Sequence, residues 1–164
     1  MNGTNYETFS KKPIKLYFDT CCYSRWQDDQ TLAQIVAEAR AIEGIINICH
    51  IVGHIIVGSP VVVSELLKNT DTKERDADTA LFWETIDCYI RPSAADFARA
   101  QIFRAAGLKR KDSRHLAVAE AAGADVLLTV DKGFLRVGGN KNLCAVRVMN
   151  PINFLQELIN GYSN

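Results

Sequence analysis

Five short runs of mostly apolar residues, separated by segments with helical patterns, constrain the fold of this chain more than any other feature. The runs are Lys15–Phe18, His54–Gly58, Ile86–Ile90, Val126–Val130 and Cys144–Val148. Most are continuously apolar and do not alternate with polar residues, which is typical of strands buried on both faces. Strands of this kind that alternate with helices predict a parallel sheet covered on both sides. The predicted fold class is therefore α/β with three layers.

The segments between the runs carry helix-start signals. Predicted helices begin at Thr31, with Gln34 completing a capping box, at Ser59 before Pro60, at Asp71, at Ser93 with Asp96, at Asp112 and at Asn150–Pro151. A small polar residue followed by a helix former three residues later, or by Pro, is the usual pattern of a helix N-terminus. The helix from Ser93 is expected to end at Gly107, and the helix from Asp112 at Gly123.

The chain has 164 residues, of which 48% are hydrophobic. This length and composition suit a single core, so we expect residues 14–164 to form one domain and residues 1–13 to form a flexible polar tail. Five cysteines without a metal-binding spacing indicate a reduced, cytoplasmic protein. Residues 1–13 are polar and lack the apolar core of a secretory signal, so no such signal is expected. Residues 44–64 carry no charge, but their His, Asn, Gly and Pro residues predict a helix end, a turn and a strand rather than a membrane span.

The formal net charge of zero hides an uneven distribution along the chain. Residues 1–98 contain 9 basic and 14 acidic residues, whereas residues 99–141 contain 9 basic and 4 acidic residues. Neutrality excludes coating of nucleic acid by bulk charge. A polyanion would have to meet the basic stretch from residue 99 to residue 141.

Four carboxylates are placed to meet at one edge of the predicted sheet. Asp19 and Asp131 follow apolar strands, while Glu65 and Asp112 lie early in helices. In an open α/β sheet, ligands bind beyond the carboxyl ends of the strands, where the helices that follow also begin. Clustered carboxylates repel one another unless a cation neutralises them. Oxygen ligands without an accompanying His or Cys favour Mg²⁺ or Mn²⁺, which predicts a metal-dependent phosphodiesterase.

The same segments carry a family resemblance. Residues 17–22 (YFDTCC), 64–66 (SEL), 111–117 (KDSRHLA) and 128–131 (LTVD) resemble PIN domain nucleases, especially bacterial members related to VapC-type toxins. The resemblance covers about residues 15–158. It implies a five-stranded parallel sheet in the order 3-2-1-4-5 and cleavage of single-stranded RNA. It also implies a Mg²⁺ or Mn²⁺ site formed by Asp19, Glu65, Asp112 and Asp131, with Thr20 and Thr129 as hydroxyl supports.

Basic residues surround two of these carboxylates. The candidate RNA contacts are Arg25, Lys109, Arg110, Lys111, Arg114 and Lys132. Cations beside a metal site would guide RNA phosphates toward it. Lys132 is also a departure, because many members of the family carry an acidic residue directly after the last aspartate, so one or two metals remain possible. His115 shares a helical face with Asp112, and the resemblance implies that it packs or supports neighbouring site residues rather than catalyses.

The candidate functions belong to different classes. The main interpretation is a metal-dependent endoribonuclease. The resemblance to VapC-type toxins extends this interpretation to the toxin of a toxin–antitoxin pair, with an antitoxin protein as partner and a homodimer as the expected assembly. An alternative is a catalytically weak PIN-like module that binds RNA or protein. A phosphatase of the haloacid dehalogenase type is disfavoured, because that chemistry requires an acidic residue where Cys21 stands.

Overall fold

A computed structural model describes residues 12–140 and 142–162 of the chain. Its five strands form one sheet in the order β3-β2-β1-β4-β5, and every neighbouring pair is parallel. The strands are β1 (Lys15–Phe18), β2 (Ile55–Gly58), β3 (Cys88–Tyr89), β4 (Val126–Leu128) and β5 (Arg147–Met149). The predicted α/β class and the strand order 3-2-1-4-5 are confirmed. Most of the predicted tail, residues 1–11, lies outside the described residues.

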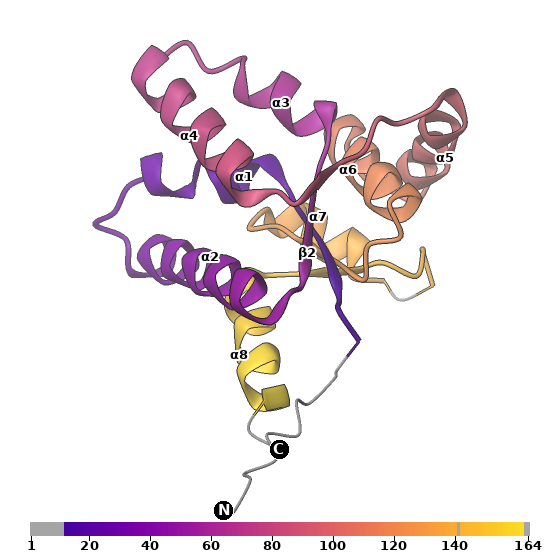
Figure 1. The fold of residues 1–164 in the computed structure, drawn as a ribbon. Helices are drawn as coiled ribbons and strands as arrows, with labels where there is room; N and C mark the ends of the chain where they lie inside the picture. Colours follow the sequence, from indigo (N-terminus) through magenta and orange to yellow (C-terminus); the bar gives the residue numbers. More distant parts are fainter. Residues whose placement is uncertain (1–11, 141, 163–164) are drawn as a thin grey trace, which may run out of the picture.

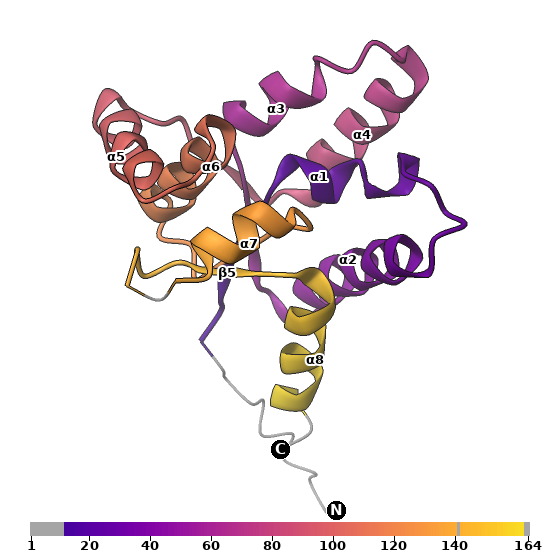
Figure 2. The same cartoon turned by 180° about the vertical axis from the view of Figure 1, so that it is seen from behind.

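Helices flank this sheet (Figures 1 and 2). The helices are α1 (Thr20–Tyr23), α2 (Ala33–Val52), α3 (Pro60–Leu66), α4 (Thr72–Thr85), α5 (Ala94–Ala105), α6 (Arg110–Ala121), α7 (Lys132–Gly138) and α8 (Pro151–Tyr162), with a 3₁₀ turn, η1, at Arg25–Gln27. In both views α5 lies beside α6, and α2 lies beside α8. Helix α3 contacts both α1 and α6. Three helix beginnings thus meet near the carboxyl ends of the strands.

The central strands form the most deeply buried part of the core. In β1, Leu16, Tyr17 and Phe18 have no exposed surface, and the β4 residues that pair with them are equally apolar. Burial on both faces explains why these runs lack polar alternation. Since β1 and β4 are parallel neighbours, Asp19 and Thr129, which follow them, lie at the same edge of the sheet.

Strands β3 and β5 begin at Cys88 and Arg147, later than the predicted Ile86 and Cys144. Two helix starts also differ from the prediction. The capping box of Thr31 with Gln34 is wrong: the Thr31 hydroxyl donates to Asp29 Oδ1 over 2.6 Å, and α2 begins after Leu32 without a side-chain cap. A local turn competes for the hydroxyl that would otherwise cap the helix. Helix α6 begins at Arg110, two residues before the predicted start. The capping box of Ser93 with Asp96 is confirmed.

The uncharged stretch at residues 44–64 divides as expected. Helix α2 ends at Gly53, whose φ of 79° is the left-handed conformation that ends a helix, and β2 and α3 follow. Glycine adopts this conformation without strain, which allows the sharp change of direction. Within the described residues, none of the helices is long and apolar enough to cross a membrane.

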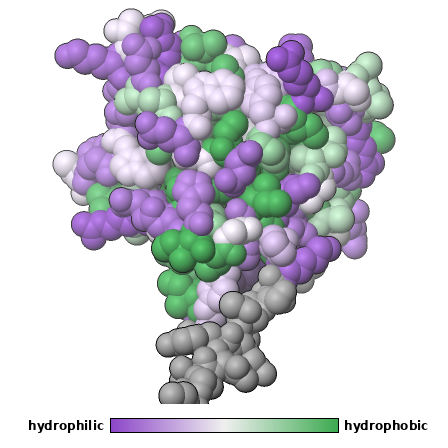
Figure 3. Space-filling view, in the orientation of Figure 1, coloured by the Kyte–Doolittle hydropathy of each residue, from purple (hydrophilic) through white to green (hydrophobic). Residues whose placement is uncertain are grey.

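The surface mixes polar and apolar side chains. Figure 3 shows apolar groups separated by polar ones, with one group near α8. Exposed apolar side chains at the end of α2 and on α8 include Ile51, Val52 and Ile159. All five cysteines are free, and Cys22 and Cys49 are buried as small apolar side chains.

Candidate active site

Asp19 lies at the centre of the candidate site. It follows β1, and only 2% of the residue is exposed. Its Oδ2 atom accepts hydrogen bonds from Thr129 Oγ1 (2.7 Å) and Cys21 Sγ (3.1 Å). Its Oδ1 atom is buried without a hydrogen bond, and His115 Nε2 lies 3.3 Å away. A buried carboxylate oxygen without a hydrogen bond is costly and requires a compensating charge.

Glu65, in the second turn of α3, points toward the same place. Its Oε2 atom accepts from the Thr20 hydroxyl (2.6 Å) and from His115 Nε2 (2.9 Å), and the Lys111 ammonium lies 3.1 Å away. Because a carboxylate only accepts, Nε2 of His115 carries a proton. The other ring nitrogen lies 2.9 Å from the Tyr17 hydroxyl. These contacts tie β1, α1, α3 and α6 together at one point.

This network fixes Glu65 as an anion. Burial alone would raise its pKa, but the hydrogen bond and charge of His115, the Thr20 hydroxyl and the Lys111 ammonium lower the pKa to about 2. The same ion pair raises the pKa of Lys111 against the opposing effect of burial. Hydrogen bonds to the charged form of a carboxyl group lower its pKa in this way.

Asp112 is in the opposite electrostatic situation. It lies in the first turn of α6 and is 4% exposed. Burial, followed by the negative charges of Asp19 and Asp131, raises its pKa to about 6, despite the opposing charges of His115 and Lys109. Asp112 therefore lies close enough to Asp19 and to Asp131 to be repelled by their charges. A cation placed among them would relieve this repulsion.

Asp131 caps the N-terminus of α7 in addition to lying near the candidate site. It precedes α7, and its Oδ1 atom accepts from the Phe134 backbone N–H over 2.9 Å as an N-cap. Its Oδ2 atom lies 4.0 Å from the Lys109 ammonium, and the side chain is 38% exposed. One oxygen thus caps a helix, while the other lies near the Lys109 ammonium.

The donor set fits a divalent cation. Ligand atoms of Asp19, Glu65 and His115 all lie within 4.8 Å of one another. Carboxylates dominate, and Asp19 Oδ1 lacks a hydrogen bond. Oxygen ligands of this kind suit Mg²⁺ and Mn²⁺. Because Nε2 of His115 carries a proton, this histidine donates to the carboxylates and does not itself bind the cation in this geometry. The expectation of a site without nearby His or Cys is wrong, since His115 and Cys21 both touch Asp19.

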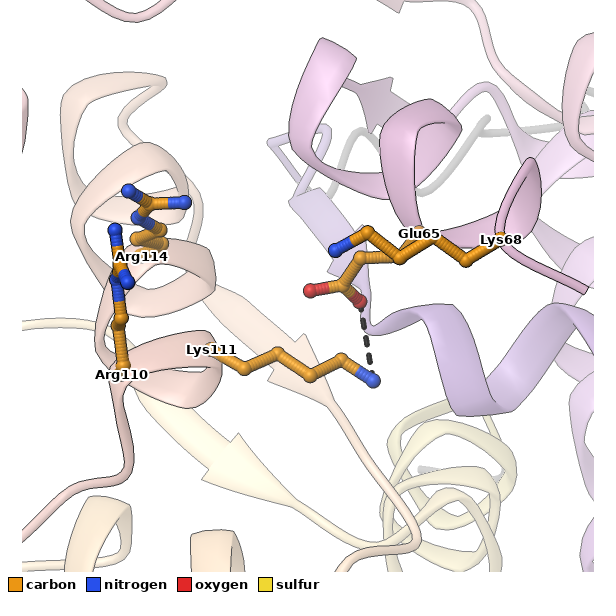
Figure 4. A pocket seen from close by; sticks show the side chains of 5 residues that line it. All are labelled: Glu65, Lys68, Arg110, Lys111 and Arg114. Atoms are coloured by element: carbon orange, nitrogen blue, oxygen red, sulfur yellow. Dashed lines mark ion pairs between the residues drawn. The ribbon is translucent and has the colours of Figure 1, made fainter.

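A basic hollow adjoins Glu65. It has a volume of about 580 Å³ and is shown in Figure 4. Its lining residues are Glu65, Lys68, Arg110, Lys111 and Arg114. In Figure 4 the arginines extend from α6, Lys68 extends from the opposite wall, and the Lys111 ammonium reaches Glu65. Three of the predicted RNA contacts, Arg110, Lys111 and Arg114, are thus brought together beside the carboxylates.

The other predicted RNA contacts are placed differently. Lys109 is 74% exposed beside Asp131, and Lys132 is exposed at the start of α7. Arg25 instead donates to Glu38 and Asp28, and its side chain is 17% exposed. These ion pairs hold η1 against α2, so Arg25 has a structural partner in place of a phosphate.

Sequence reasoning underestimated His115 and did not identify Lys68. His115 has no exposed surface and contacts Asp19, Glu65 and Tyr17. The available signal was its position three residues after Asp112, which places both on one face of α6. Lys68 carried no comparable signal, because it follows α3 in a generic segment.

Comparisons with known proteins agree with this geometry. Residues 16–140 match the PIN domain family. Among solved structures, the chain is similar to one reported as VapBC2 from Rickettsia felis bound to a DNA fragment from their promoter, with a TM-score of 0.53 and 16% sequence identity. The similarity covers 84% of this chain and 98% of that chain. No curated protein matches the sequence significantly.

Proposed function

This chain belongs to the PIN domain family, and from that premise we propose that it is a metal-dependent endoribonuclease that hydrolyses phosphodiester bonds of single-stranded RNA. The observation that carries the proposal is the buried Asp19 carboxylate, whose Oδ1 atom lacks a hydrogen bond, together with the buried Asp112, whose pKa is raised in part by the charges of Asp19 and Asp131. A sheet edge that concentrates negative charge in this way is suited to holding a cation, and a cation is suited to a phosphate.

Asp19, Glu65, Asp112 and Asp131 would hold Mg²⁺ or Mn²⁺. When bound, such an ion stabilises negative charge on the phosphate and makes water a better nucleophile. The protein's contribution is to orient the carboxylates. Thr129 and Thr20 donate to Asp19 and Glu65, and His115 holds Glu65. Such supporting hydrogen bonds fix the direction of each ligand oxygen.

The basic residues would bind the RNA backbone. Arg110 and Arg114 line the hollow beside Glu65, and Lys109 and Lys132 are exposed near Asp131. Lys111 neutralises Glu65 and is within reach of a phosphate that approaches it. Phosphate contacts of this kind position the chain without reading its sequence.

We further propose an antitoxin protein as partner, a homodimer as assembly, and the cytoplasm as location. Support for a partner comes from the similarity to VapBC2, a structure solved with a promoter DNA fragment. Exposed Ile51, Val52 and Ile159 offer apolar surface for association. A small reading frame upstream of this gene that encodes a DNA-binding motif would support a toxin–antitoxin pair.

Cleavage of a labelled single-stranded RNA tests the proposed activity. We expect cleavage with Mn²⁺ or Mg²⁺, none with EDTA, and recovery when the cation is restored. Asp19→Asn removes the central charge while preserving the shape of the side chain, so it should abolish cleavage while the circular dichroism spectrum stays unchanged. Equal cleavage by this variant would refute the assignment.

The alternative is a PIN-like binding module without effective catalysis. The observation that favours it is the Lys111 ammonium 3.1 Å from Glu65, which neutralises one carboxylate without a metal. Calorimetric titration with Mn²⁺ separates the two functions. Binding that disappears in Asp19→Asn supports the nuclease, whereas a wild-type protein that binds RNA but not Mn²⁺ supports the module.

A further inference from the structure

A second hollow continues the basic surface away from the carboxylates. It lies between α5 and α6 and has a volume of about 130 Å³. Its lining residues are Phe97, Ala100, Gln101, Arg104, Arg110, Ser113 and Arg114. Arg110 and Arg114 also line the hollow beside Glu65, so the two spaces adjoin across these arginines. The surface thus runs from the candidate metal site to α5.

The charge of this surface is strongly one-sided. Within residues 12–140 and 142–162, Glu65 is the only acidic residue that lines either hollow. Among the described residues, Arg104, Arg110 and Arg114 have no ion pair with a carboxylate within 4.0 Å, unlike Arg99, which pairs with Glu120. Cations without acidic partners attract a polyanion more strongly than paired ones do. A row of them suits successive phosphates better than a single small anion.

An aromatic ring stands beside these cations. Phe97, in the first turn of α5, is 39% exposed, and the Arg114 guanidinium lies over its ring at 5.6 Å from the centroid. Exposed aromatic rings next to arginines are stacking platforms for the bases of single-stranded nucleic acids. The contact with Arg114 keeps the Phe97 ring oriented.

We propose that the hollow between α5 and α6 is a nucleotide subsite, in which a base one nucleotide beyond the two that flank the cleaved bond stacks on Phe97 and its phosphate contacts Arg104. Arg110 and Arg114 join this subsite to the catalytic centre. The inference rests on the proposed ribonuclease function and deepens it, because it assigns a flanking nucleotide to a defined place. It follows that substrates longer than a dinucleotide gain affinity on this side.

Binding and cleavage experiments on full-length protein test the subsite. Fluorescence anisotropy with a labelled twelve-nucleotide RNA is measured in an Asp19→Asn background, so that the RNA stays intact. Phe97→Leu should weaken binding about tenfold, because base–aromatic stacking contributes substantially to affinity. Arg104→Gln should reduce the slope of log affinity against log salt concentration by about 0.7, as expected for the loss of one phosphate contact on a single strand.

Matched controls lie on α4. Trp83 is another exposed aromatic residue and Arg75 another surface arginine, so Trp83→Leu and Arg75→Gln should leave RNA binding unchanged. In an otherwise unaltered protein, Phe97→Leu should lower kcat/KM for the long RNA about tenfold and leave kcat/KM for a dinucleotide unchanged. A merely structural defect would lower both values and the melting temperature.

The outcomes distinguish the two proposals. A wild-type protein that cleaves no RNA of any length refutes the nuclease. If it cleaves, but Phe97→Leu and Arg104→Gln bind and cleave the long RNA normally, the subsite is refuted. A labelled oligoglutamate peptide serves as a competitor of another class. If both variants lose binding of this peptide but keep binding of RNA, the hollow is a protein-docking site.

Discussion

Aspartates at the two edges of the sheet differ in what holds them. At the amino edge, Asp125 and Asp87 precede β4 and β3, and their Oδ2 atoms accept from the backbone N–H groups of Lys15 and Ile56, each over 2.8 Å. At the carboxyl edge, Asp19 accepts only from side chains, and its Oδ1 atom has no hydrogen bond. The aspartates at the amino edge therefore complete the hydrogen bonding of the strands, whereas the carboxylate of Asp19 at the carboxyl edge makes no hydrogen bond to the backbone of the described residues.

This difference separates aspartates that stabilise the sheet from aspartates that are free to take part in binding or catalysis. The amino-edge aspartates complete reciprocal hydrogen bonds between neighbouring strands, since Asp125 N–H also donates to Lys15 O and Asp87 N–H to Ile56 O. Asp112, at the carboxyl edge, is buried among like charges that help raise its pKa. Strain of this kind is retained where function requires it. Variants at the two edges should therefore behave oppositely.

The largest expected difference is in cleavage. Asp112→Asn should lower the rate of RNA cleavage roughly 10³-fold, because it removes a charge that the bound cation and the phosphate require. Asp125→Asn removes the same charge at the opposite edge and should leave the rate within about twofold of wild type. Single-turnover assays with both variants measure this contrast. Equal losses in both variants would contradict the functional distinction between the edges.

Stabilisation of the fold by a bound metal should depend on the carboxyl edge and not on the amino edge. Mn²⁺ at 100 times its dissociation constant should raise the free energy of unfolding by about 2.7 kcal/mol, since it binds only the folded site. Thermal melts with and without Mn²⁺ should show this gain in wild type and Asp125→Asn. The gain should be strongly reduced in Asp112→Asn. A gain that persists in Asp112→Asn but disappears in Asp125→Asn would place the cation at the amino edge and contradict the proposed site.

His115 offers a way to sharpen the comparison within the carboxyl edge. Replacement by Leu removes the donor to Glu65 and the partner of the Tyr17 hydroxyl, both in a buried network. We expect a loss of about 2 kcal/mol in the free energy of unfolding of the metal-free protein. His50→Leu is the control, because His50 is exposed and contacts one carbonyl, that of Thr85. Denaturant titration measures both, and similar losses would show that His115 is an ordinary histidine.

The sequence was sufficient to predict the strand order through the family resemblance and the edge where the carboxylates meet. Apolar runs report burial directly, and a residue that follows a parallel strand must lie at the carboxyl edge. Helix starts were harder, because Lys109 precedes α6 without a side-chain cap and Thr31 bonds to Asp29 instead of capping α2. Both outcomes depend on which nearby group a side chain bonds to, and the sequence pattern does not determine that choice.

Partner choice was the other limit of sequence reasoning. Arg25 follows the first motif, as an RNA contact would, yet it pairs with Glu38, thirteen positions further along the chain. The placement of His115 against Asp19 arises from tertiary packing, in which α6 lies against α3 and β4, and it brings together residues 96 positions apart. Charge and spacing identify candidates, whereas tertiary packing decides which of them meet.

The smallest and most diagnostic effect concerns stability without metal. Asp112→Asn should raise the free energy of unfolding by about 1 kcal/mol, since it removes a buried charge that its neighbours repel. Asp125→Asn should lower it slightly, because a charge-assisted hydrogen bond to Lys15 N–H becomes a neutral one. Urea denaturation in EDTA at pH 7.5 measures both changes. Opposite signs are the essential result, because an edge destabilised by crowded carboxylates gains stability when it loses a charge. Two changes of the same sign would remove the basis for treating the edges as different.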